Sequence, residues 1–310
     1  MRSSDAHHER IRGVWFAAAA FFAWGFLPLY WKALRQVPSP QILAHRITWS
    51  CVYLTLILAA RKGFPEAWAS FSTWRRRVFI LASAATIGIN WFIYIWAVNA
   101  DHVVETSLGY FINPIVSIVL GMIFLRERLN FWQYVAVSIV VGAVLLLTVR
   151  YGRLPWIALS LAASFGTYGL LRKTSHAESL SGLYLETMIL SPFALFYILI
   201  MTTRGGGSFG TVSPLTHLLL AASGVVTATP LIWFANGARR IPLSMLGFIQ
   251  YLAPSIQLCL GIFVFREPFT KTHLVSFALI WCAIVVYTLT HTPVLGGTVS
   301  RGAAGAGRAS

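Results

Sequence analysis

Two ionisable residues lie well inside long apolar runs of the chain, and they are the first candidates for chemistry. Arg46 falls within residues 40–60 and Glu186 within residues 179–202, and the two positions are 140 apart. Charge inside a membrane-spanning segment is costly, and by default it marks a functional site. We predict that these side chains act in gates that form and break, or serve as permanent struts that neutralise buried charge.

These two charges are expected at opposite depths of the membrane, near the outer end of one run and the inner end of the other. At about 1.5 Å per residue, in a hydrocarbon core of about 30 Å, they lie on the order of 12 Å apart along the membrane normal. We therefore predict that Arg46 and Glu186 do not pair. Arg46 is expected to meet Glu105 near the outer mouth, and Glu186 to meet a cytoplasmic base, either Arg240 or Arg239.

Polar and aromatic residues near the middle of the apolar runs are the candidates for binding a substrate. Aromatic walls with a few amide groups suit an amphipathic or zwitterionic solute, although the same residue types also serve ordinary helix packing. The candidates for this pocket are Trp24, Asn90, Tyr94, Tyr110, Asn113, Tyr168, Trp233, Gln250 and Tyr251. Four other tryptophans near the ends of runs are assigned to the interfacial belts, namely Trp15, Trp31, Trp132 and Trp156.

Few residues have the spacing of metal ligands. His102 and Glu105 are three positions apart and share a helix face, but no third ligand is near in sequence, so a helix cap at the outer end is expected there. The three cysteines fall inside apolar runs without a CxxC pair, at Cys51, Cys259 and Cys282. We expect no disulfide, no metal, no cofactor and no catalytic residue.

One stretch of the chain occurs twice, as Val104–Leu129 and again as Ser244–Phe269. The landmarks displaced by the same 140 residues are Pro114 and Pro254, Gly121 and Gly261, Arg126 and Arg266, and Glu127 and Glu267. Each copy is interrupted by its proline beside a polar residue, Asn113 or Gln250. A proline frees a backbone carbonyl, which must face protein or a wet cavity in a membrane, so both copies are expected to line a cavity.

The composition places the chain in the bilayer. Hydrophobic residues make up 57% of its 310 positions and charged residues only 11%, and the mean hydropathy is +0.71. This composition is typical of a polytopic membrane protein and excludes a soluble domain of this length. The net charge of +15 does not indicate nucleic acid, because the bases lie in short loops that meet the lipid bilayer and no basic stripe is interleaved with aromatic residues.

Windows of about 20 residues, the length that crosses a membrane, predict an all-α protein with ten transmembrane helices. The predicted spans are 13–31, 40–60, 78–97, 102–124, 131–149, 154–172, 179–202, 214–236, 242–265 and 271–290. Five spans in each repeat is an odd number, so the second repeat enters the membrane upside down. We predict a cytoplasmic tail at 1–12, a first five-helix repeat at 13–149, an inverted second five-helix repeat at 154–290 and a disordered tail at 291–310.

The basic residues orient these spans. With a cytoplasmic N-terminus, sixteen bases fall on the inside and seven on the outside, so the bias favours both termini in the cytoplasm. The outside seven are Lys32, Arg35, Arg150, Arg153, Arg204, Arg266 and Lys271. The glycines at 205–207 do not match a phosphate-binding loop, because no strand precedes them and no Lys-Ser or Lys-Thr follows, and a floppy external loop is expected.

Several segments together resemble a RarD-type member of the EamA group, in the drug/metabolite transporter superfamily. They are AHRITWS at 44–50, ETSLGYFINP at 105–114, RERL at 126–129 with Gln133, TATPLIWFANGARRIPLSMLGFIQYLAP at 227–254, REPF at 266–269 and SFALIW at 276–281. The resemblance implies a permease of the cytoplasmic membrane, with two inverted five-helix repeats around a central cavity. Members are often labelled chloramphenicol-sensitivity or resistance permeases, and better understood relatives export amino acids and other metabolites.

The leading hypothesis is therefore a secondary transporter, a metabolite or amino acid exporter that works by alternating access on a small-molecule substrate. The alternative is efflux of drugs or lipophilic cations, although the carboxylate on which the superfamily's small cation pumps rely is missing from residues 13–31. An intramembrane enzyme is a third reading, but no HExxH or GxGD motif occurs. Protons are kept as a candidate coupling ion, through Glu186 or Glu105.

Overall fold

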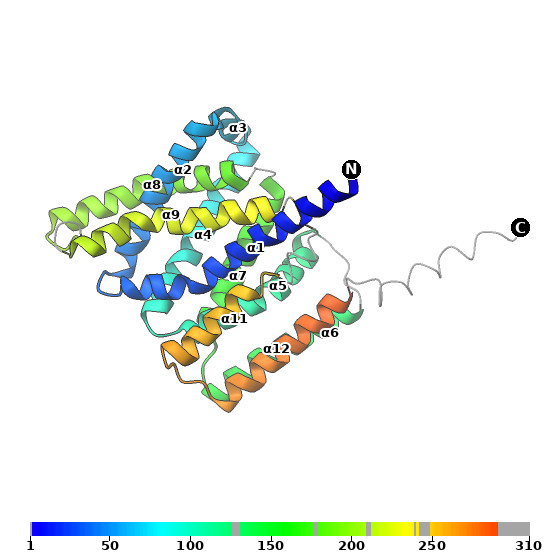
Figure 1. The fold of residues 1–310 in the computed structure, drawn as a ribbon. Coiled ribbons are helices and arrows are strands. Elements are labelled where there is room, and N and C mark those ends of the chain that lie inside the picture. The colour runs from blue at the N-terminus through cyan, green and yellow to red at the C-terminus, as the bar shows by residue number, and fades with distance from the viewer. Residues whose placement is uncertain are drawn as a thin grey trace, which may run out of the picture.

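The computed structural model describes residues 2–125, 131–175, 179–208, 212–238, 240–241 and 249–290. Within these ranges the chain forms helices and no strand (Figure 1). The helices are α1 (Arg2–Ala33), α2 (Ser39–Arg61), α3 (Phe64–Ala69), α4 (Trp74–Asn99), α5 (Val103–Leu125), α6 (Phe131–Tyr151), α7 (Trp156–Ser175), α8 (Ser179–Thr203), α9 (Pro214–Ala238), α11 (Leu252–Cys259), the π-helical turn η1 (Leu260–Val264) and α12 (Lys271–Thr290).

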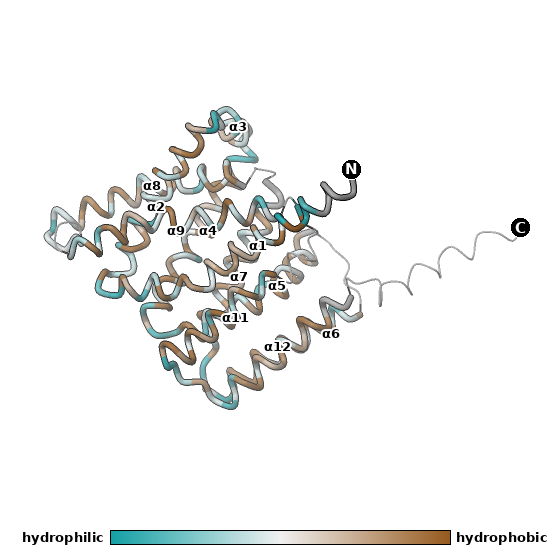
Figure 2. The backbone as a smooth tube through the Cα atoms, viewed as in Figure 1, coloured by the Kyte–Doolittle hydropathy of each residue, from teal (hydrophilic) through white to brown (hydrophobic). Residues whose placement is uncertain are grey.

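Seven of the described helices are long and apolar enough to cross a membrane: α1, α2, α4, α5, α6, α8 and α9. Two shorter apolar helices cover Leu252–Val264 and Lys271–Val286. Figure 2 shows apolar helix bodies with hydrophilic residues gathered at the connections. The protein is thus an all-α polytopic membrane protein. Of the ten predicted spans, the one at 242–265 lies partly outside the described residues, and α7 falls below the same standard of length and apolarity.

The helices pack as a bundle in which segments far apart in sequence are neighbours. Helix α1 packs on α9 and α11, α7 packs on α4 and α5, and α2 packs on α8 and α9. Helices α6 and α12 contact each other closely and form a pair at one side of the bundle (Figure 1). The start of α1 and the end of α12 lie on the same side of the bundle (Figure 1), which is called the N-terminal end below.

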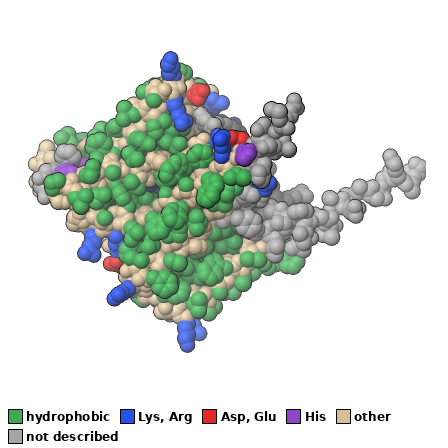
Figure 3. Space-filling view, viewed as in Figure 1, with side chains coloured by type: hydrophobic (Ala, Val, Ile, Leu, Met, Phe, Trp, Pro, Cys, Tyr) green, Lys and Arg blue, Asp and Glu red, His purple; other side chains and the backbone are tan. Residues whose placement is uncertain are grey.

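The outer flanks of the bundle are apolar. Figure 3 shows hydrophobic side chains covering the visible face, with Lys and Arg side chains at its margins. Large exposed apolar residues occur on several helices, including Val149 at 79%, Phe263 at 76% and Phe193 at 72% exposed. A soluble monomer rarely exposes so much contiguous apolar surface, whereas lipid tails cover such flanks at little cost.

The two copies of the repeated stretch differ locally. Pro114 lies inside the continuous helix α5, whereas the second copy is turned at residues 250–251 and resumes as α11, which carries Pro254 near its start. The Ser107 hydroxyl donates a hydrogen bond to the Pro254 carbonyl at 2.7 Å, so the two copies contact each other beside the second proline.

Residues 2–12, predicted as a tail, are helical and continue into α1. Two expectations about the connections need correction. The connection after α2 contains α3, which the apolar windows did not predict because it is one short turn-like helix. The glycine-containing loop after α8 is tied down where it is described, because the Gln41 amide donates to the Gly206 carbonyl at 2.8 Å and accepts from the Ser208 amide at 2.7 Å.

Candidate substrate cavity and its charged residues

A cavity of about 640 Å³ lies between the helices. Its walls come from α1, α2, α4, α5, α7, α8, α9 and α11, so both halves of the chain build it. Seven of the nine predicted pocket residues line it: Trp24, Asn90, Tyr94, Tyr110, Asn113, Tyr168 and Gln250. Its size is that of sites for small organic ligands, and its wall is mainly aromatic and aliphatic with a few amides.

Two predicted pocket residues lie outside this wall. Trp233 and Tyr251 do not line the cavity, and the Tyr251 ring stacks on Phe111 with centroids 6.0 Å apart. Their depth in the membrane was predicted from sequence position, but the rotation of a helix decides which residues at one depth face inward. Helix α9, which carries Trp233, has apolar residues around its full circumference, so no polar face indicates its rotation, and Tyr251 lies at the turn before α11.

Arg46 lines the cavity and is only 4% exposed. Its guanidinium carbon lies 4.2 Å from the ring centroid of Trp91 and 5.0 Å from that of Trp31. The predicted partner Glu105 is not in contact with it, which corrects that expectation. Trp31 is fully buried, so it is not a residue of the interfacial belt.

Glu186 is fully buried and has three polar partners. Ser83 donates a hydrogen bond at 2.7 Å, Tyr168 donates another at 3.1 Å, and an Arg172 nitrogen lies 3.5 Å from the carboxylate. The predicted partner Arg240 is elsewhere, and Arg239 lies outside the described residues. Arg46 and Glu186 form no ion pair, in agreement with the prediction.

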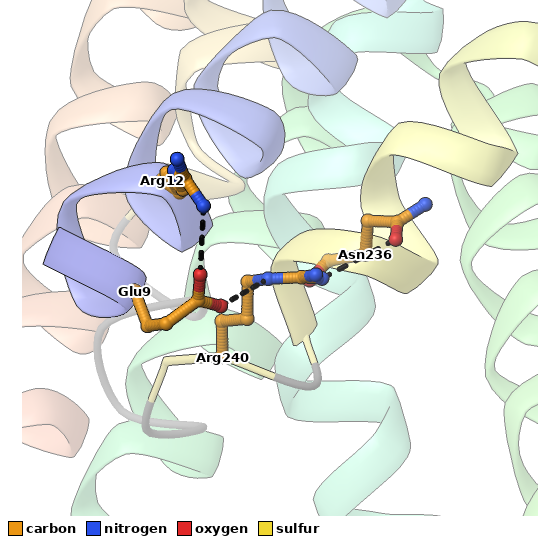
Figure 4. Close-up of polar contacts among 4 residues, drawn as sticks. All are labelled: Glu9, Arg12, Asn236 and Arg240. Carbon is orange, nitrogen blue, oxygen red and sulfur yellow. Dashed lines mark hydrogen bonds and ion pairs between the residues drawn. The ribbon is translucent and has the colours of Figure 1, made fainter. Parts of the chain in front are cut away.

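Arg240 lies at the N-terminal end of the bundle, against the first turns of α1 (Figure 4). It donates to Glu9 at 3.0 Å and reaches back to the carbonyl of Asn236 at 2.9 Å, while Arg12 donates to the same Glu9 at 3.0 Å. Glu9 is half exposed in this pair. Water screens an ion pair that is this exposed, so this contact between the two halves can open at little cost.

The opposite end of the bundle is closed by stronger contacts. The Glu267 carboxylate, which is 8% exposed, accepts the backbone amides of Val103 and Val104 at 2.7 Å each and so caps α5. Glu105 was expected as an outer-end cap, and it accepts from the Ile157 amide at 3.3 Å, at the start of α7. Charge-assisted bonds to the first amides of a helix also gain from the helix dipole.

Further ties cross between the halves at the same end. Gln36 donates to Thr216 at 2.9 Å, Tyr30 donates to the carbonyl of Leu219, and Gln41 holds the loop after α8. Lys32 pairs with Asp101 within the first half. The end at which α2 begins is therefore bound across the halves by several hydrogen bonds, several of them partly or fully buried.

The cavity reaches the N-terminal end instead. Its lining includes exposed Arg61 and Glu66, beside the end of α2, together with Ser181 at the start of α8 and Asn236 near the end of α9. None of the groups that close the opposite end lines it. Sequence reasoning missed Arg61, Glu66 and Arg172 as cavity residues, because basic and acidic residues near span ends were assigned to loops.

Comparisons with known proteins agree on one family. A sequence model of the EamA-like transporter family matches residues 11–149. The uncharacterized transporter YojE of Bacillus subtilis (strain 168) is 44% identical over 91% of this chain and 95% of its own. Protein RarD of Streptomyces exfoliatus is 42% identical over 91% and 90%. One solved crystal structure covers 89% of this chain and 96% of its own, with a TM-score of 0.57 and 21% identity, which supports the fold alone.

Proposed function

Because the chain belongs to the EamA-like transporter family, as a RarD-type permease, we propose that it moves a small amphipathic metabolite across the cell membrane by alternating access. The family makes it a membrane transporter with a small-molecule substrate. The substrate class, the direction and the mechanism are the parts proposed here.

One observation carries the proposal: a cavity of about 640 Å³ that reaches the surface at the N-terminal end and is sealed at the other end by ties between the halves. A carrier needs one binding cavity and two closures, only one of which is open at a time. The exposed Glu9–Arg240 pair at the open end and the buried Glu267 cap at the closed end are candidates for parts of those closures.

The packing supports an inverted repeat. A repeat gives each helix of the first half a counterpart in the second: α1 and α7, α2 and α8, α4 and α9, α5 and α11, and α6 and α12. When each helix is exchanged for its counterpart, the contact of α1 with α9 becomes the contact of α7 with α4. The contact α5 with α7 becomes α11 with α1, and both members of each exchange are observed. The pairs α6 with α12, α2 with α8 and α5 with α11 map onto themselves. We propose repeats at 13–149 and 154–290 that rock against each other around the cavity.

The loop charges support a cytoplasmic location for both termini. In that orientation the cavity opens to the cytoplasm, as an exporter needs when it loads its substrate. Of the remaining roles, we propose Arg46 as a substrate-binding residue and the Glu186–Arg172 pair as the candidate proton-coupling or structural element. Efflux of lipophilic cations is the weaker alternative, since the charged residues on the cavity wall are Arg46, Arg61 and Arg172 against Glu66 alone.

Counterflow in proteoliposomes tests the proposal. Vesicles loaded with an unlabelled amino acid should transiently accumulate the same labelled amino acid, because a carrier exchanges solute through one site, and a panel of amino acids is screened with empty vesicles as the control. Counterflow without a pH gradient indicates exchange in which Glu186 acts structurally. Net uptake that needs a gradient and is lost in Glu186→Gln indicates proton coupling, and no counterflow for any member contradicts an amino acid exporter.

A further inference from the structure

Arg46 is a buried cation that lacks a counter-ion in the described part of the chain. It is 4% exposed, and neither Nε nor Nη1 has a hydrogen-bond partner there. It stands about two turns from the start of α2, so it lies toward the closed end of the bundle and faces the cavity.

The chain has few carboxylates to offer this arginine, because it contains only nine acidic residues. Five of the described ones are engaged elsewhere: Glu9 with Arg12 and Arg240, Asp101 with Lys32, Glu105 with His102 and the Ile157 amide, Glu186 with Arg172, and Glu267 with the Val103 and Val104 amides. Glu66 is exposed at the far mouth of the cavity. None of the six forms an ion pair with Arg46.

The rings around Arg46 offset only part of the cost of burying its charge. Trp91 and Trp31 offer their faces to the guanidinium at 4.2 and 5.0 Å, and a desolvated cation–π contact contributes about 2 kcal/mol. The penalty for burying an ion is several kcal/mol, and it is repaid best by an anion with which the donors can hydrogen-bond. The rings hold the guanidinium in place while leaving donors along its edge unused.

Further unused polar atoms lie on the same cavity wall. The Tyr94 hydroxyl is buried with no partner among the described residues, and its ring packs on Tyr110 with centroids 5.7 Å apart. Asn113 and Gln257 each have one buried side-chain oxygen without a partner there. Polar atoms left unsatisfied in the folded protein are expensive, and here they gather around a space large enough for a ligand.

Resting on the proposed function, we propose that Arg46 binds the carboxylate of the transported solute, which is a small organic acid with an apolar body. The planar guanidinium can donate two parallel hydrogen bonds to a carboxylate, and the Tyr94 hydroxyl is a further donor. The aromatic wall contacts the body of the solute. A lipophilic cation is disfavoured at this site by the charge of Arg46.

Binding to the purified full-length chain in detergent tests this site without requiring transport. The ligands share one phenyl-bearing body and differ in charge: 3-phenylpropionate, its neutral amide, 3-phenylpropylamine and L-phenylalanine. Titration calorimetry should show saturable binding of 3-phenylpropionate at least about tenfold tighter than the amide, and no binding of the amine. L-Phenylalanine separates a simple anion from a zwitterion, since both carry the carboxylate.

Substitutions then assign the selectivity to Arg46. Arg46→Gln should weaken carboxylate binding by about 10- to 100-fold, the loss expected for charge-assisted hydrogen bonds, and leave amide binding unchanged. Arg46→Lys should retain part of the affinity, because it keeps the charge and loses the planar fork. The matched control is Arg35→Gln, since Arg35 is exposed beyond the end of α1 and does not line the cavity.

Three results would overturn the inference. The first is equal affinity of the wild-type chain for 3-phenylpropionate and its amide, a result that does not depend on whether the Arg46 variants fold. The second is an unchanged preference for the carboxylate over the amide in a folded Arg46→Gln. Counterflow of the amine or the amide alone would leave the permease standing and remove the carboxylate site. Tight carboxylate binding without any counterflow would keep the site and contradict the transport proposal.

Discussion

Gly182 is the residue on which the Glu186 site depends most closely. A Cβ at this position would lie 1.4 Å from the Nη1 atom of Arg172, the nitrogen that pairs with Glu186. Gly182→Ala should therefore displace the guanidinium and leave the buried carboxylate with only Ser83 and Tyr168. Removing one partner of a buried pair costs on the order of 3–5 kcal/mol. We expect Gly182→Ala to lose a substantial fraction of this free energy of unfolding, which would lower the midpoint of thermal unfolding in detergent.

A double variant shows whether the loss acts through the ion pair. If Gly182 matters because it leaves room for Arg172, adding Glu186→Gln to Gly182→Ala should cause little further loss, so the two effects are non-additive. Additive losses would mean that Gly182 is needed for helix packing alone. Gly142→Ala is the matched glycine control, since no atom lies within 4 Å of a Cβ built there.

The sequence indicated which single residues carry unusual charge, but not what they touch. Arg46 and Glu186 stand out as charges within apolar runs, and both are buried. Their partners depend on helix rotation and side-chain reach. Arg172 is the last residue of the predicted span 154–172, and its side chain is 15% exposed and reaches Glu186. An arginine stem can lie along apolar surface while its head group finds a buried partner.

At the scale of the helices, the Glu267 cap on α5 holds the closed end. Glu267→Gln keeps the shape of the side chain and removes its charge, so one of its bonds to the Val103 and Val104 amides is lost and the other weakens. Hydrogen exchange at these two amides should accelerate, because bonds to a charged acceptor contribute about 1.5–3 kcal/mol each. Glu66→Gln, at the other end of the bundle, is the control. Equal protection of the Val103 and Val104 amides from hydrogen exchange in both variants would exclude Glu267 as a closure.

The crossing of α2 and α9 depends on Gly224. A Cβ there would lie 2.3 Å from the backbone carbon of Trp49 and 2.4 Å from its oxygen, and backbone atoms cannot move aside without separating the helices. Gly224→Ala should lower the free energy of unfolding by about 1–3 kcal/mol. The measurement is the midpoint of thermal unfolding, with Gly142→Ala as the control variant. Equal stability of the two variants would contradict so close a contact between α2 and α9.

The seven long apolar helices could be predicted from apolar run length, because each membrane crossing needs a similar stretch. The distortions within helices could not. Pro114 and Pro254 occupy matching places in the repeat, yet the first lies within a continuous helix and the second near the start of a new one. The two copies contact each other through the Ser107 bond to the Pro254 carbonyl, and the sequence pattern carries no information about such contacts.

At the scale of the whole molecule, one cavity lies between an end of the bundle that it reaches and an end that hydrogen bonds close. The repeat of 140 residues and the loop charges predicted two related halves and their orientation in the membrane. They did not predict which end would be open in this conformation, because the repeated stretches near the two ends have related sequences. Only the contacts that form, such as those of Glu267 and Gln41, distinguish the two ends.

The most direct test is the accessibility of a cysteine in the cavity from each side of the membrane. Gly169 lines the cavity and has no atom within 4 Å of a built Cβ, so Gly169→Cys should be tolerated once the three native cysteines are replaced. Gly142→Cys, which does not line the cavity, is the control.

A membrane-impermeant thiol reagent should label Gly169→Cys quickly in inverted vesicles and slowly in right-side-out vesicles. Adding Glu267→Gln should raise the rate at which Gly169→Cys is labelled in right-side-out vesicles. Equal labelling from both sides would indicate a pore, and fast labelling only from the outside would reverse the orientation. Rates that Glu267→Gln leaves unchanged would contradict an outer closure built on that carboxylate.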